Sequence, residues 1–419
     1  MSESVPRIVW VVLGLSLAAK MSVVGWASGI ELILDEVNYM DFGEHLLAHG
    51  TLPSAFRPPV YPGLIALSQL IGGADPAAMR ILQALIATAA GLTLYRWLLG
   101  HVGHRGALLS CTLWSLYPVF IGFTHLLWTE TVFLSMLIFF LATAMPAGAL
   151  SPKRTAAAGV LYGLTCLTRS VMTPVAWLAP LVVMAAPSRW AWRPRPGRQA
   201  FIFAMAWSMT MGPWIGHNLV VEGRPILTET SNGYNLWKGN TPWSHPLATE
   251  GPQYPGPILS IPAFPYEGSG PRLTAHCEAQ HTDTAPFSRW HLSRCARSMA
   301  IDHIVGRPIA FLQRGISKLG HALHPSNLLQ RHQLLGIYGE SPPSLKAALT
   351  WGTTLPYLGL IALFPIALRR APRSPATAIL LSLAAYQAAV IFITFGNTRF
   401  RLPILLMGMI LAAWIPKRD

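Results

Sequence analysis

Residues 9–39 read VWVVLGLSLAAKMSVVGWASGIELILDEVNY, an apolar run that leads directly into a cluster of acidic residues. The part from Val9 to Trp26 is long enough, as a helix, to cross most of the roughly 30 Å hydrocarbon layer of a membrane. It has no small-residue cleavage site before the polar segment, and many further apolar runs follow, so a removed signal peptide is not indicated. We therefore expect a retained first membrane span followed by an acidic loop.

Composition extends this interpretation to the whole chain. The 419 residues are 52% hydrophobic and only 11% charged, and the mean hydropathy is +0.41, which excludes an ordinary soluble domain of this length. Apolar runs of spanning length lie near residues 8–29, 77–98, 105–123, 131–147, 156–172, 173–187, 200–216, 347–368, 374–395 and 402–416. The sequence predicts an all-α polytopic membrane protein with about ten transmembrane helices.

The distribution of basic residues predicts the topology. The formal net charge is +14, which in a soluble protein would suggest nucleic-acid binding, but here the basic residues fall mostly in short loops between apolar runs. If the short run 59–72 lies along the interface, these loops all share one side with both termini, which the positive-inside rule places in the cytoplasm. The basic loops carry Arg96, Arg105, Lys153, Arg154, Arg189, Arg193, Arg195, Arg198, Arg369, Arg370, Arg373, Lys417 and Arg418.

This topology predicts three regions. Residues 1–216 form an N-terminal transmembrane module that contains the outer loop 30–77, residues 217–346 form a large outer loop region, and residues 347–419 form C-terminal transmembrane helices. The segments around Glu130 and residues 396–401 also lie on the outer side. Ionisable groups close to the hydrocarbon layer are costly and point to function, so we look for chemistry in these outer segments.

The first outer loop carries two such constellations. Asp35, Glu36 and Tyr39 follow the first span, where a carboxylate can act as a general base or bind a metal; a solvated acidic loop is the alternative. Arg57 precedes two prolines, which disfavour a helix at Arg57, and Tyr61 follows them. A guanidinium at headgroup depth suits phosphate, because its planar fork donates two hydrogen bonds, although such an arginine also anchors helices to headgroups.

Four further charged residues stand at predicted outer ends of spans. Glu130 begins a span, where a carboxylate is also a favourable partner of the helix dipole. Arg169 lies between two apolar runs, and Arg399 and Arg401 flank a phenylalanine just before the last span. Because these arginines run against the positive-inside bias, a purely topological role explains them less well than it explains the cytoplasmic arginines.

The large outer loop begins with polar residues that suit sugar recognition. His217 is followed by the stretch Asn232-Gly-Tyr-Asn-Leu-Trp-Lys-Gly-Asn240, in which Asn235, Lys238 and Asn240 are candidate substrate-binding residues. The same composition also suits an ordinary tight turn. The many histidines of this loop show no zinc-binding pattern. Cys277 and Cys295 form either a disulfide or two free thiols, depending on the compartment.

Taken together, the motifs resemble the GT-C membrane glycosyltransferases, and most closely the bacterial branch shared by aminoarabinose transferase and protein O-mannosyltransferases. The motifs, in chain order, are Asp-Glu with Tyr (35–39), Arg-Pro-Pro-x-Tyr-Pro (57–62), Thr-Glu (129–130), Gly-Leu-x-x-Leu-x-Arg (163–169), Gly-x-Asn-Leu-x-x-Gly-Asn (233–240) and Arg-x-Arg-Leu-Pro (399–403). The resemblance runs from Val9 to the end of the chain, and it is weakest between Thr241 and Pro343.

The resemblance implies a GT-C-like bundle with interfacial helices in the first outer loop, and it implies roles for single residues. Asp35 matches the catalytic carboxylate of the first loop, with Glu36 beside it, and Glu130 falls near the second acidic position. Arg57 stands where relatives hold a Lys or His, which keeps a positive charge. The arginines implied to grip the carrier phosphate are Arg57, Arg169, Arg399 and Arg401.

The implied activity is transfer of a monosaccharide from a polyprenyl-phosphate-linked donor to a lipid, glycan or protein acceptor, by a single inverting displacement with Asp35 as base. We expect a monomer in the bacterial inner membrane with a periplasmic active site, without a nucleic-acid partner or a required cofactor, while a divalent metal stays open. Two alternatives remain. The first is a lipid-linked sugar transporter or flippase, although the sequence shows no internal repeat. The second is an oligosaccharide ligase that uses a pyrophosphate-linked donor, which would need more positive charge around the leaving group.

Overall fold

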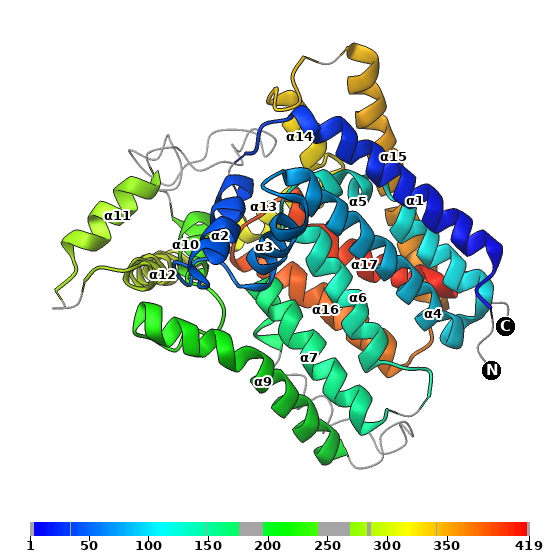
Figure 1. The fold of residues 1–419 in the computed structure, drawn as a ribbon, viewed down its shortest axis with the longest axis horizontal. Coiled ribbons are helices and arrows are strands. Elements are labelled where there is room, and N and C mark those ends of the chain that lie inside the picture. Colours follow the sequence, from blue (N-terminus) through cyan, green and yellow to red (C-terminus); the bar gives the residue numbers. More distant parts are fainter. Residues whose placement is uncertain are drawn as a thin grey trace.

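The structure is a computed structural model that describes residues 4–33, 35–148, 150–175, 196–241, 269–282, 286–340 and 342–416. Within these ranges the chain forms α-helices and short 3-10 helices and no strand (Figure 1). An all-α fold, as predicted, is confirmed for the described residues.

The helices fall into a bundle and two outer groups. The bundle contains α1 (Arg7–Trp26), α4 (Pro76–Leu116), α5 (Pro118–Gly122), α6 (Glu130–Ala144), α7 (Pro152–Thr168), α9 (Pro196–Glu222), α15 (Pro343–Arg370), α16 (Pro375–Ile393) and α17 (Leu402–Leu411). The first outer group is α2 (Asp35–His49) and α3 (Val60–Gly72), and the second is α10 (Ser231–Asn240), α11 (Ser269–Ala279), α12 (Arg289–Gly306), α13 (Pro308–Ala322) and α14 (Leu328–Leu334). The 3-10 helices are η1 (Ala27–Gly29), η2 (Phe123–His125), η3 (Ser170–Met172), η6 (Thr398–Arg401) and η7 (Ala412–Trp414).

Four helical segments of the described residues are long and apolar enough to cross a membrane: Arg7–Gly29, Pro76–Leu116, Pro343–Arg370 and Pro375–Ile393. The other predicted spans also coincide with helices, but these are shorter or less apolar, and the last one ends as α17 followed by η7. The predicted span 173–187 lies mostly outside the described residues, as do Arg189, Arg193, Arg195, Lys417 and Arg418. The helix α3, with 13 residues, covers about 20 Å and is too short for a crossing.

Helix α4 contains two of the predicted spans, which are separated by a reversal. Gly103 has φ 76° and ψ −179°, a conformation that interrupts the helix and that glycine adopts without steric cost. The indole Nε1 of Trp114 donates to the carbonyl oxygen of Ala87 at 2.9 Å, whereas a straight helix would separate these residues by about 40 Å. Residues 77–98 and 105–116 therefore pack side by side as two antiparallel helices.

Small residues let the bundle helices approach closely. A Cβ on Gly106 would lie 2.0 Å from the carbonyl oxygen of Ala413, and one on Gly159 would lie 2.6 Å from that of Phe203. Close backbone approach at small residues is typical of helices packed within a membrane, where apolar burial gives little preference for helix–helix over helix–lipid contact. The bundle therefore holds its helices, and the outer segments at their ends, in fixed relative positions.

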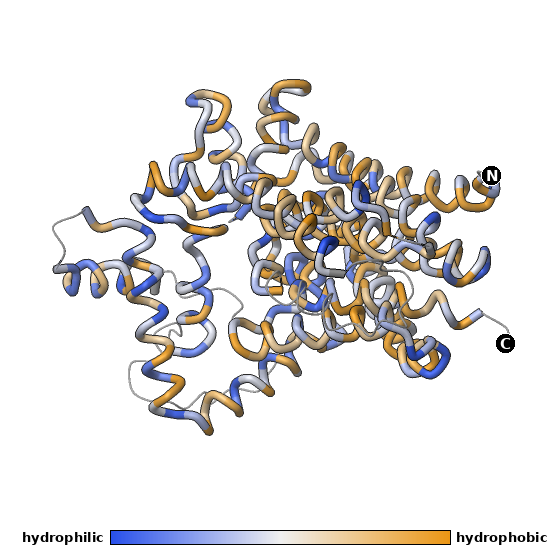
Figure 2. Tube along the Cα trace, turned by 90° about the horizontal axis from the view of Figure 1, so that it is seen from below, coloured by the Kyte–Doolittle hydropathy of each residue, from blue (hydrophilic) through white to orange (hydrophobic). Residues whose placement is uncertain are grey.

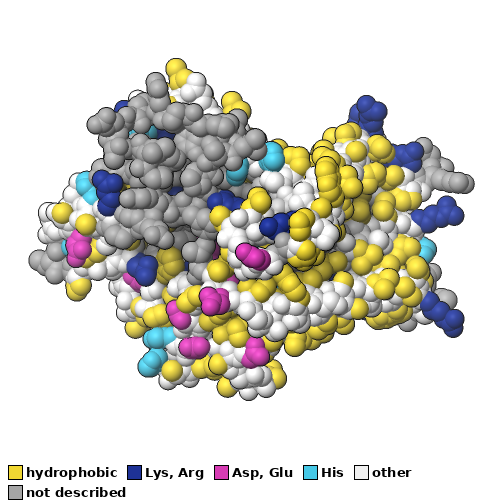
Figure 3. All heavy atoms as spheres, turned by 90° about the horizontal axis from the view of Figure 1, so that it is seen from above, with side chains coloured by type: hydrophobic (Ala, Val, Ile, Leu, Met, Phe, Trp, Pro, Cys, Tyr) yellow, Lys and Arg dark blue, Asp and Glu magenta, His cyan; other side chains and the backbone are white. Residues whose placement is uncertain are grey.

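The two ends of the bundle differ in charge. Several basic side chains lie at the end that holds both termini, at the right of Figure 3, and others lie towards the opposite end, where the acidic side chains of this view are also found. Figure 2 shows hydrophobic residues along the bundle and more hydrophilic ones towards α11 and α12. The segments 30–59 and 223–230 and the helices α10 to α14 thus belong to the end opposite the termini, where the sequence placed the outer segments.

Candidate functional site

A cavity of about 820 Å³ opens at this end, between the bundle and α10. Its wall combines residues from α2, the segment before α3, α6, the region after α7, α10, α16 and η6. The sequence-predicted residues on this wall are Asp35, Tyr39, Arg57, Glu130, Arg169, Asn235, Lys238 and Arg399. Residues from opposite ends of the chain therefore meet in one space that is large enough for a small ligand.

Asp35 and Arg57 form the first ion pair of this wall. Arg57 Nη2 lies 2.6 Å from Asp35 Oδ1, and Arg57 Nε donates to Asn38 Oδ1 at 2.8 Å. The guanidinium also lies over the ring of Tyr39, 4.6 Å from its centroid. Asp35, Asn38 and Tyr39 occupy one face of α2, because residues three and four apart share a helix face. Arg57 reaches them from the non-helical segment that the following prolines enforce.

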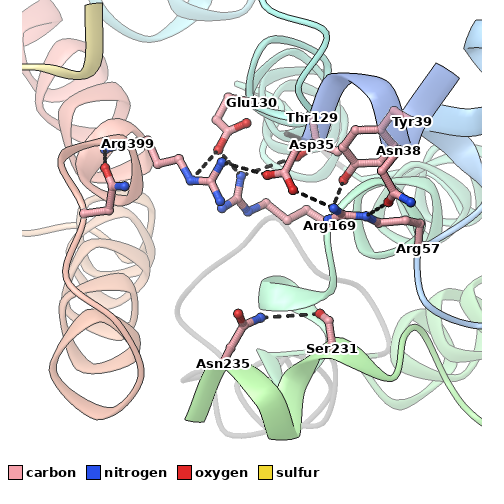
Figure 4. A network of polar contacts seen from close by, with 11 residues as sticks. Asp35, Asn38, Tyr39, Arg57, Thr129, Glu130, Arg169, Ser231, Asn235 and Arg399 are labelled. Atoms are coloured by element: carbon pink, nitrogen blue, oxygen red, sulfur yellow. Dashed lines mark hydrogen bonds and ion pairs between the residues drawn. The ribbon is translucent and has the colours of Figure 1, made fainter. Parts of the chain in front are cut away.

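Arg399 joins this pair to a second one. Arg169 Nη1 lies 2.5 Å from Glu130 Oε1, Arg399 Nη1 lies 3.2 Å from Asp35 Oδ2, and Arg399 Nε lies 3.6 Å from Glu130 Oε1. Figure 4 shows the resulting network, in which three arginines alternate with two carboxylates. Its side chains come from α2, the segment before α3, α6, the residue after α7, and η6.

Aromatic rings contact two arginines of the network. The Arg399 guanidinium lies 4.8 Å from the ring centroid of Trp128 and 5.1 Å from that of Phe400. Arg169 lies 5.1 Å from the ring of Phe400. Cation–π contacts of this kind hold an arginine in place without using its N–H donors. N–H donors of Arg169 and Arg399 are therefore left to bind an anion.

The network shifts the acidity of its members. Burial alone would raise the pKa of Asp35, but the adjacent Arg57 and Arg399 outweigh it and hold the pKa well below its usual range. Burial raises the pKa of Tyr39 to about 12. Burial, with a contribution from Arg399, lowers the pKa of Lys238 to about 8. At neutral pH the site therefore keeps Asp35 ionised, Tyr39 neutral and Lys238 mostly charged.

Cationic side chains outnumber acidic ones on the described part of the wall. The cations are Arg57, Arg169, Lys238, Arg331 and Arg399, and the acidic residues are Asp35, Glu130 and Glu229. A cavity with this balance, walled by protein and partly closed to solvent, favours an anionic ligand.

In the described ranges no three His, Cys, Asp or Glu side chains gather in a way that would hold a metal ion.

The structure places five of the predicted site residues away from the cavity wall. Glu36 is buried and accepts hydrogen bonds from the backbone N–H groups of Leu127 and Ile33 at 2.8 and 3.1 Å, so its carboxylate ties α2 to the segment between η2 and α6. Tyr61 is fully buried and donates to Gln83 Oε1 at 2.9 Å. Both side chains therefore make their contacts inside the protein, away from the cavity wall.

The remaining three make contacts between segments. The ring nitrogen Nε2 of His217 lies 2.9 Å from Thr51 Oγ1. Asn240 Nδ2 donates to the carbonyl oxygen of Ile393 at 2.7 Å, which fixes α10 to α16. Arg401 is 1% exposed, and its guanidinium donates to the carbonyl oxygens of Ala322, His324 and Ser326. Arg401 thus ties η6 to the segment after α13 and does not line the described cavity wall, in contrast to the phosphate contact expected from the sequence.

The cavity also holds residues that the sequence did not single out. Glu229, Arg331, Asn232 and Ser170 line it. Glu229 stands in the tripeptide Thr-Glu-Thr at 228–230, which repeats the tripeptide around Glu130 at 129–131, and this repeat is a signal that could have drawn attention to it. Nothing in the local sequence around Arg331 distinguishes it from the other basic residues of the large loop.

The large loop is braced by a disulfide. Cys277 of α11 and Cys295 of α12 are bonded, which selects one of the two states that the sequence left open. The bond lies in a small core with Trp237, Leu273 and Ala296. Since Trp237 belongs to α10, this core supports the helix that forms the lower wall of the cavity.

Comparisons with known proteins agree with the motifs. Residues 56–214 match the family described as dolichyl-phosphate-mannose-protein mannosyltransferase; this range contains Arg57, Glu130 and Arg169. A comparison with curated proteins gave no match.

Among solved structures, the chain is similar to the archaeal oligosaccharyltransferase AglB from Archaeoglobus fulgidus in complex with an inhibitory peptide and a dolichol-phosphate. The identity is 12% and the TM-score is 0.48, over 97% of this chain and 50% of that chain, so the present chain spans about half the length of AglB. The family match over residues 56–214 agrees with the resemblance to the GT-C membrane glycosyltransferases that the motifs indicated.

Proposed function

We propose that the protein transfers a monosaccharide from a polyprenyl-phosphate-linked donor to a lipid, glycan or protein acceptor, with inversion at the anomeric carbon. The observation that carries this proposal is the network in which Arg57, Arg169 and Arg399 converge around Asp35 and Glu130. The matched family is described by a polyprenyl-type phosphate donor, a mannose and a protein acceptor, which supports the donor class.

The arginines bind the phosphate of the donor. Each presents a planar fork that suits a phosphate oxygen, and the charge that develops on the leaving phosphate in the transition state is stabilised by fixed cations. The cavity next to them also has an apolar side, formed by Val171, Val390 and Ile391. This side suits the isoprenoid chain, which stays in the bilayer while the phosphate lies at the interface.

Asp35 serves as the general base. Before the donor binds, Asp35 is engaged by Arg57 and Arg399 and is a weak base for that reason. A donor phosphate competes for the same N–H donors, so it loosens both ion pairs and raises the basicity of the carboxylate. The base is therefore strengthened when the donor is in place.

The chemical step is a single displacement. The acceptor oxygen or nitrogen forms a bond to the anomeric carbon, the bond from that carbon to the phosphate oxygen breaks, and the acceptor proton passes to Asp35. The products are the glycosylated acceptor and a polyprenyl phosphate, whose added negative charge the three arginines neutralise. This scheme needs no covalent intermediate between the sugar and the protein.

The site faces the periplasm in this proposal, in a bacterial inner membrane with both termini in the cytoplasm. The support is the set of basic side chains at the end of the bundle that holds the termini (Figure 3), because short basic loops stay cytoplasmic. The cavity also lies at one end of the bundle, whereas transporter sites lie near the middle of the membrane. This placement favours the enzyme over the flippase. The proposal keeps the expectation from the sequence that the protein acts as a monomer.

The test compares Asp35→Asn with Asp41→Asn in cells that lack the gene. Asp41 lies on the same helix and is exposed, so it receives the same chemical change outside the cavity. Mass spectrometry of membrane glycolipids and surface proteins, with and without the gene, identifies the sugar and its acceptor. We expect the wild type and Asp41→Asn to restore the missing mass, and Asp35→Asn to reduce transfer about 100- to 10,000-fold, the usual range for loss of a general base. Full transfer by a well-inserted Asp35→Asn protein would refute the assignment of the base.

A further inference from the structure

Glu229 is the one acidic residue of the described cavity wall that the proposed mechanism does not use. Its carboxylate oxygen Oε1 accepts a hydrogen bond from Ser170 Oγ, and the same hydroxyl lies 3.3 Å from Asn232 Oδ1. All three residues line the cavity. Figure 4 shows α10, which begins two residues after Glu229, on the side of the cavity away from Asp35 and Glu130.

The backbone on both sides of Glu229 is anchored without help from its side chain. The indole Nε1 of Trp214 donates to the carbonyl oxygen of Thr228 at 2.6 Å, and the N–H of Thr230 donates to the carbonyl oxygen of Ala55 at 2.8 Å. Thr228 and Thr230 are both buried, whereas Glu229 is half-buried and reaches the cavity. The segment would therefore keep its position if Glu229 lost its charge.

The carboxylate keeps binding capacity for a ligand. In the described part of the chain Glu229 closes no ion pair, and its second oxygen Oε2 receives no hydrogen bond, although Arg57 and Arg169 lie within electrostatic reach. By comparison, Asp35 and Glu130 each contact two arginines. A half-buried carboxylate with an open acceptor site and a neighbouring amide is suited to hydroxyl or ammonium donors.

The position of this cluster relates it to the donor phosphate. Ser170 follows directly after Arg169, which belongs to the proposed phosphate site, so the cluster begins one residue away from a phosphate-binding group. The sugar of the donor is bonded to that phosphate and must lie beside it. The acceptor, in an inverting displacement, approaches the anomeric carbon from the opposite side, where its proton can reach Asp35.

We infer that Glu229, Asn232 and Ser170 form a subsite that binds the transferred sugar through its hydroxyl or amino substituents. This inference rests on the proposed function, because it takes the phosphate position from it. Glu229 would accept from a hydroxyl or an ammonium group, and Asn232 would pair with a neighbouring hydroxyl. The charge of Glu229 also makes the subsite selective, since it repels a sugar that carries its own carboxylate. The substrate class is thus a neutral or amino sugar, to the exclusion of uronic acids.

The test measures the affinity of full-length protein in nanodiscs for three synthetic probes: neryl phosphate, neryl phosphate linked to mannose, and neryl phosphate linked to glucuronic acid. The variant is Glu229→Gln, which keeps the shape and removes the charge, and the control is Glu44→Gln at an exposed position of α2. The wild type and the control should bind the mannose probe at least tenfold more tightly than neryl phosphate and should discriminate against the glucuronic acid probe.

Glu229→Gln should lose most of the preference for mannose and most of the discrimination against glucuronic acid, while its affinity for neryl phosphate stays within twofold. An unchanged sugar preference, or an equal loss for neryl phosphate, would overturn the subsite. A parallel Arg399→Gln measurement separates the two proposals. If neryl phosphate binds and requires Arg399 but Glu229→Gln changes nothing, only the subsite fails; if the wild type binds none of the probes, the proposed function fails as well.

Discussion

Replacing Arg399 by glutamine should slow catalysis strongly while leaving the fold almost intact. The guanidinium lies 3.2 Å from Asp35 Oδ2 and 3.6 Å from Glu130 Oε1. After the substitution Asp35 keeps Arg57 at 2.6 Å and Glu130 keeps Arg169 at 2.5 Å, so neither carboxylate is left without a partner. The contact with Asp35 is a partly exposed ion pair, and the buried Glu130 keeps its shorter contact with Arg169. We therefore expect the free energy of unfolding to fall by only about 1 kcal/mol.

The effect on the rate should be much larger. In the proposed reaction Arg399 stabilises charge that grows on the leaving phosphate, and removal of one such fixed donor costs about 2.7–4 kcal/mol of transition-state stabilisation, or about 100- to 1000-fold in kcat. The assay is transfer from a synthetic polyprenyl phosphate sugar by the protein in nanodiscs, together with thermal unfolding of the same samples. Arg399→Lys should recover only part of the loss, because an ammonium group lacks the planar fork.

Arg401→Gln is the matched control, two residues away. Its guanidinium donates to the carbonyl oxygens of Ala322, His324 and Ser326 in the buried interior, so its loss leaves buried acceptors unsatisfied and should lower stability by about 1–3 kcal/mol. The folded fraction should keep its kcat. The reasoning would be refuted if Arg399→Gln kept more than a tenth of the wild-type kcat, or if the two variants lost stability and activity in the same proportion.

Three further predictions concern the wall of the cavity. Burial lowers the pKa of Lys238 to about 8, so Lys238 is charged below that pH and neutral above it. The affinity for neryl phosphate should therefore fall between pH 7 and pH 9, and Lys238→Arg should flatten this pH dependence. Reduction of the disulfide bond between Cys277 and Cys295 should destabilise the large loop by about 3 kcal/mol. A reductant should therefore lower the melting temperature of the wild type and leave that of a double serine variant unchanged. A Cβ on Gly239 would lie 1.5 Å from the carbonyl oxygen of Thr394, so Gly239→Ala should separate α10 from α16. We expect the free energy of unfolding to fall by about 1–3 kcal/mol and probe binding to weaken. An unchanged melting temperature would contradict the close packing.

Several features of the site were predictable from local spacing. Asp35 and Tyr39 are four residues apart on α2 and share the face that meets Arg57, as helical periodicity requires. The prolines after Arg57 kept it out of a helix, as expected. The short apolar run at residues 60–72 became α3, with too few residues to cross a bilayer.

Neighbouring residues of similar chemistry were harder to distinguish. Asp35 and Glu36 are adjacent in a helix and point about 100° apart, so one meets the arginines and the other accepts the N–H of Leu127. Arg399 and Arg401 lie in the 3-10 helix η6, where residues two apart point away from each other. Sequence patterns supply the residue types, but the direction of each side chain depends on the exact start and rotation of the helix.

The sequence by itself determined that the chain is an all-α membrane protein and that charged groups gather in its outer segments, because the hydrocarbon layer penalises charge residue by residue along the chain. Only the tertiary structure decided which of these groups meet. Asp35 and Arg399 are separated by most of the chain and come within 3.2 Å because α2 and η6 cap the same end of one bundle. Glu229 and Arg331 reach the same cavity through the packing of α10 and α14, and contacts of this kind depend on how helices pack in space, which no local pattern records.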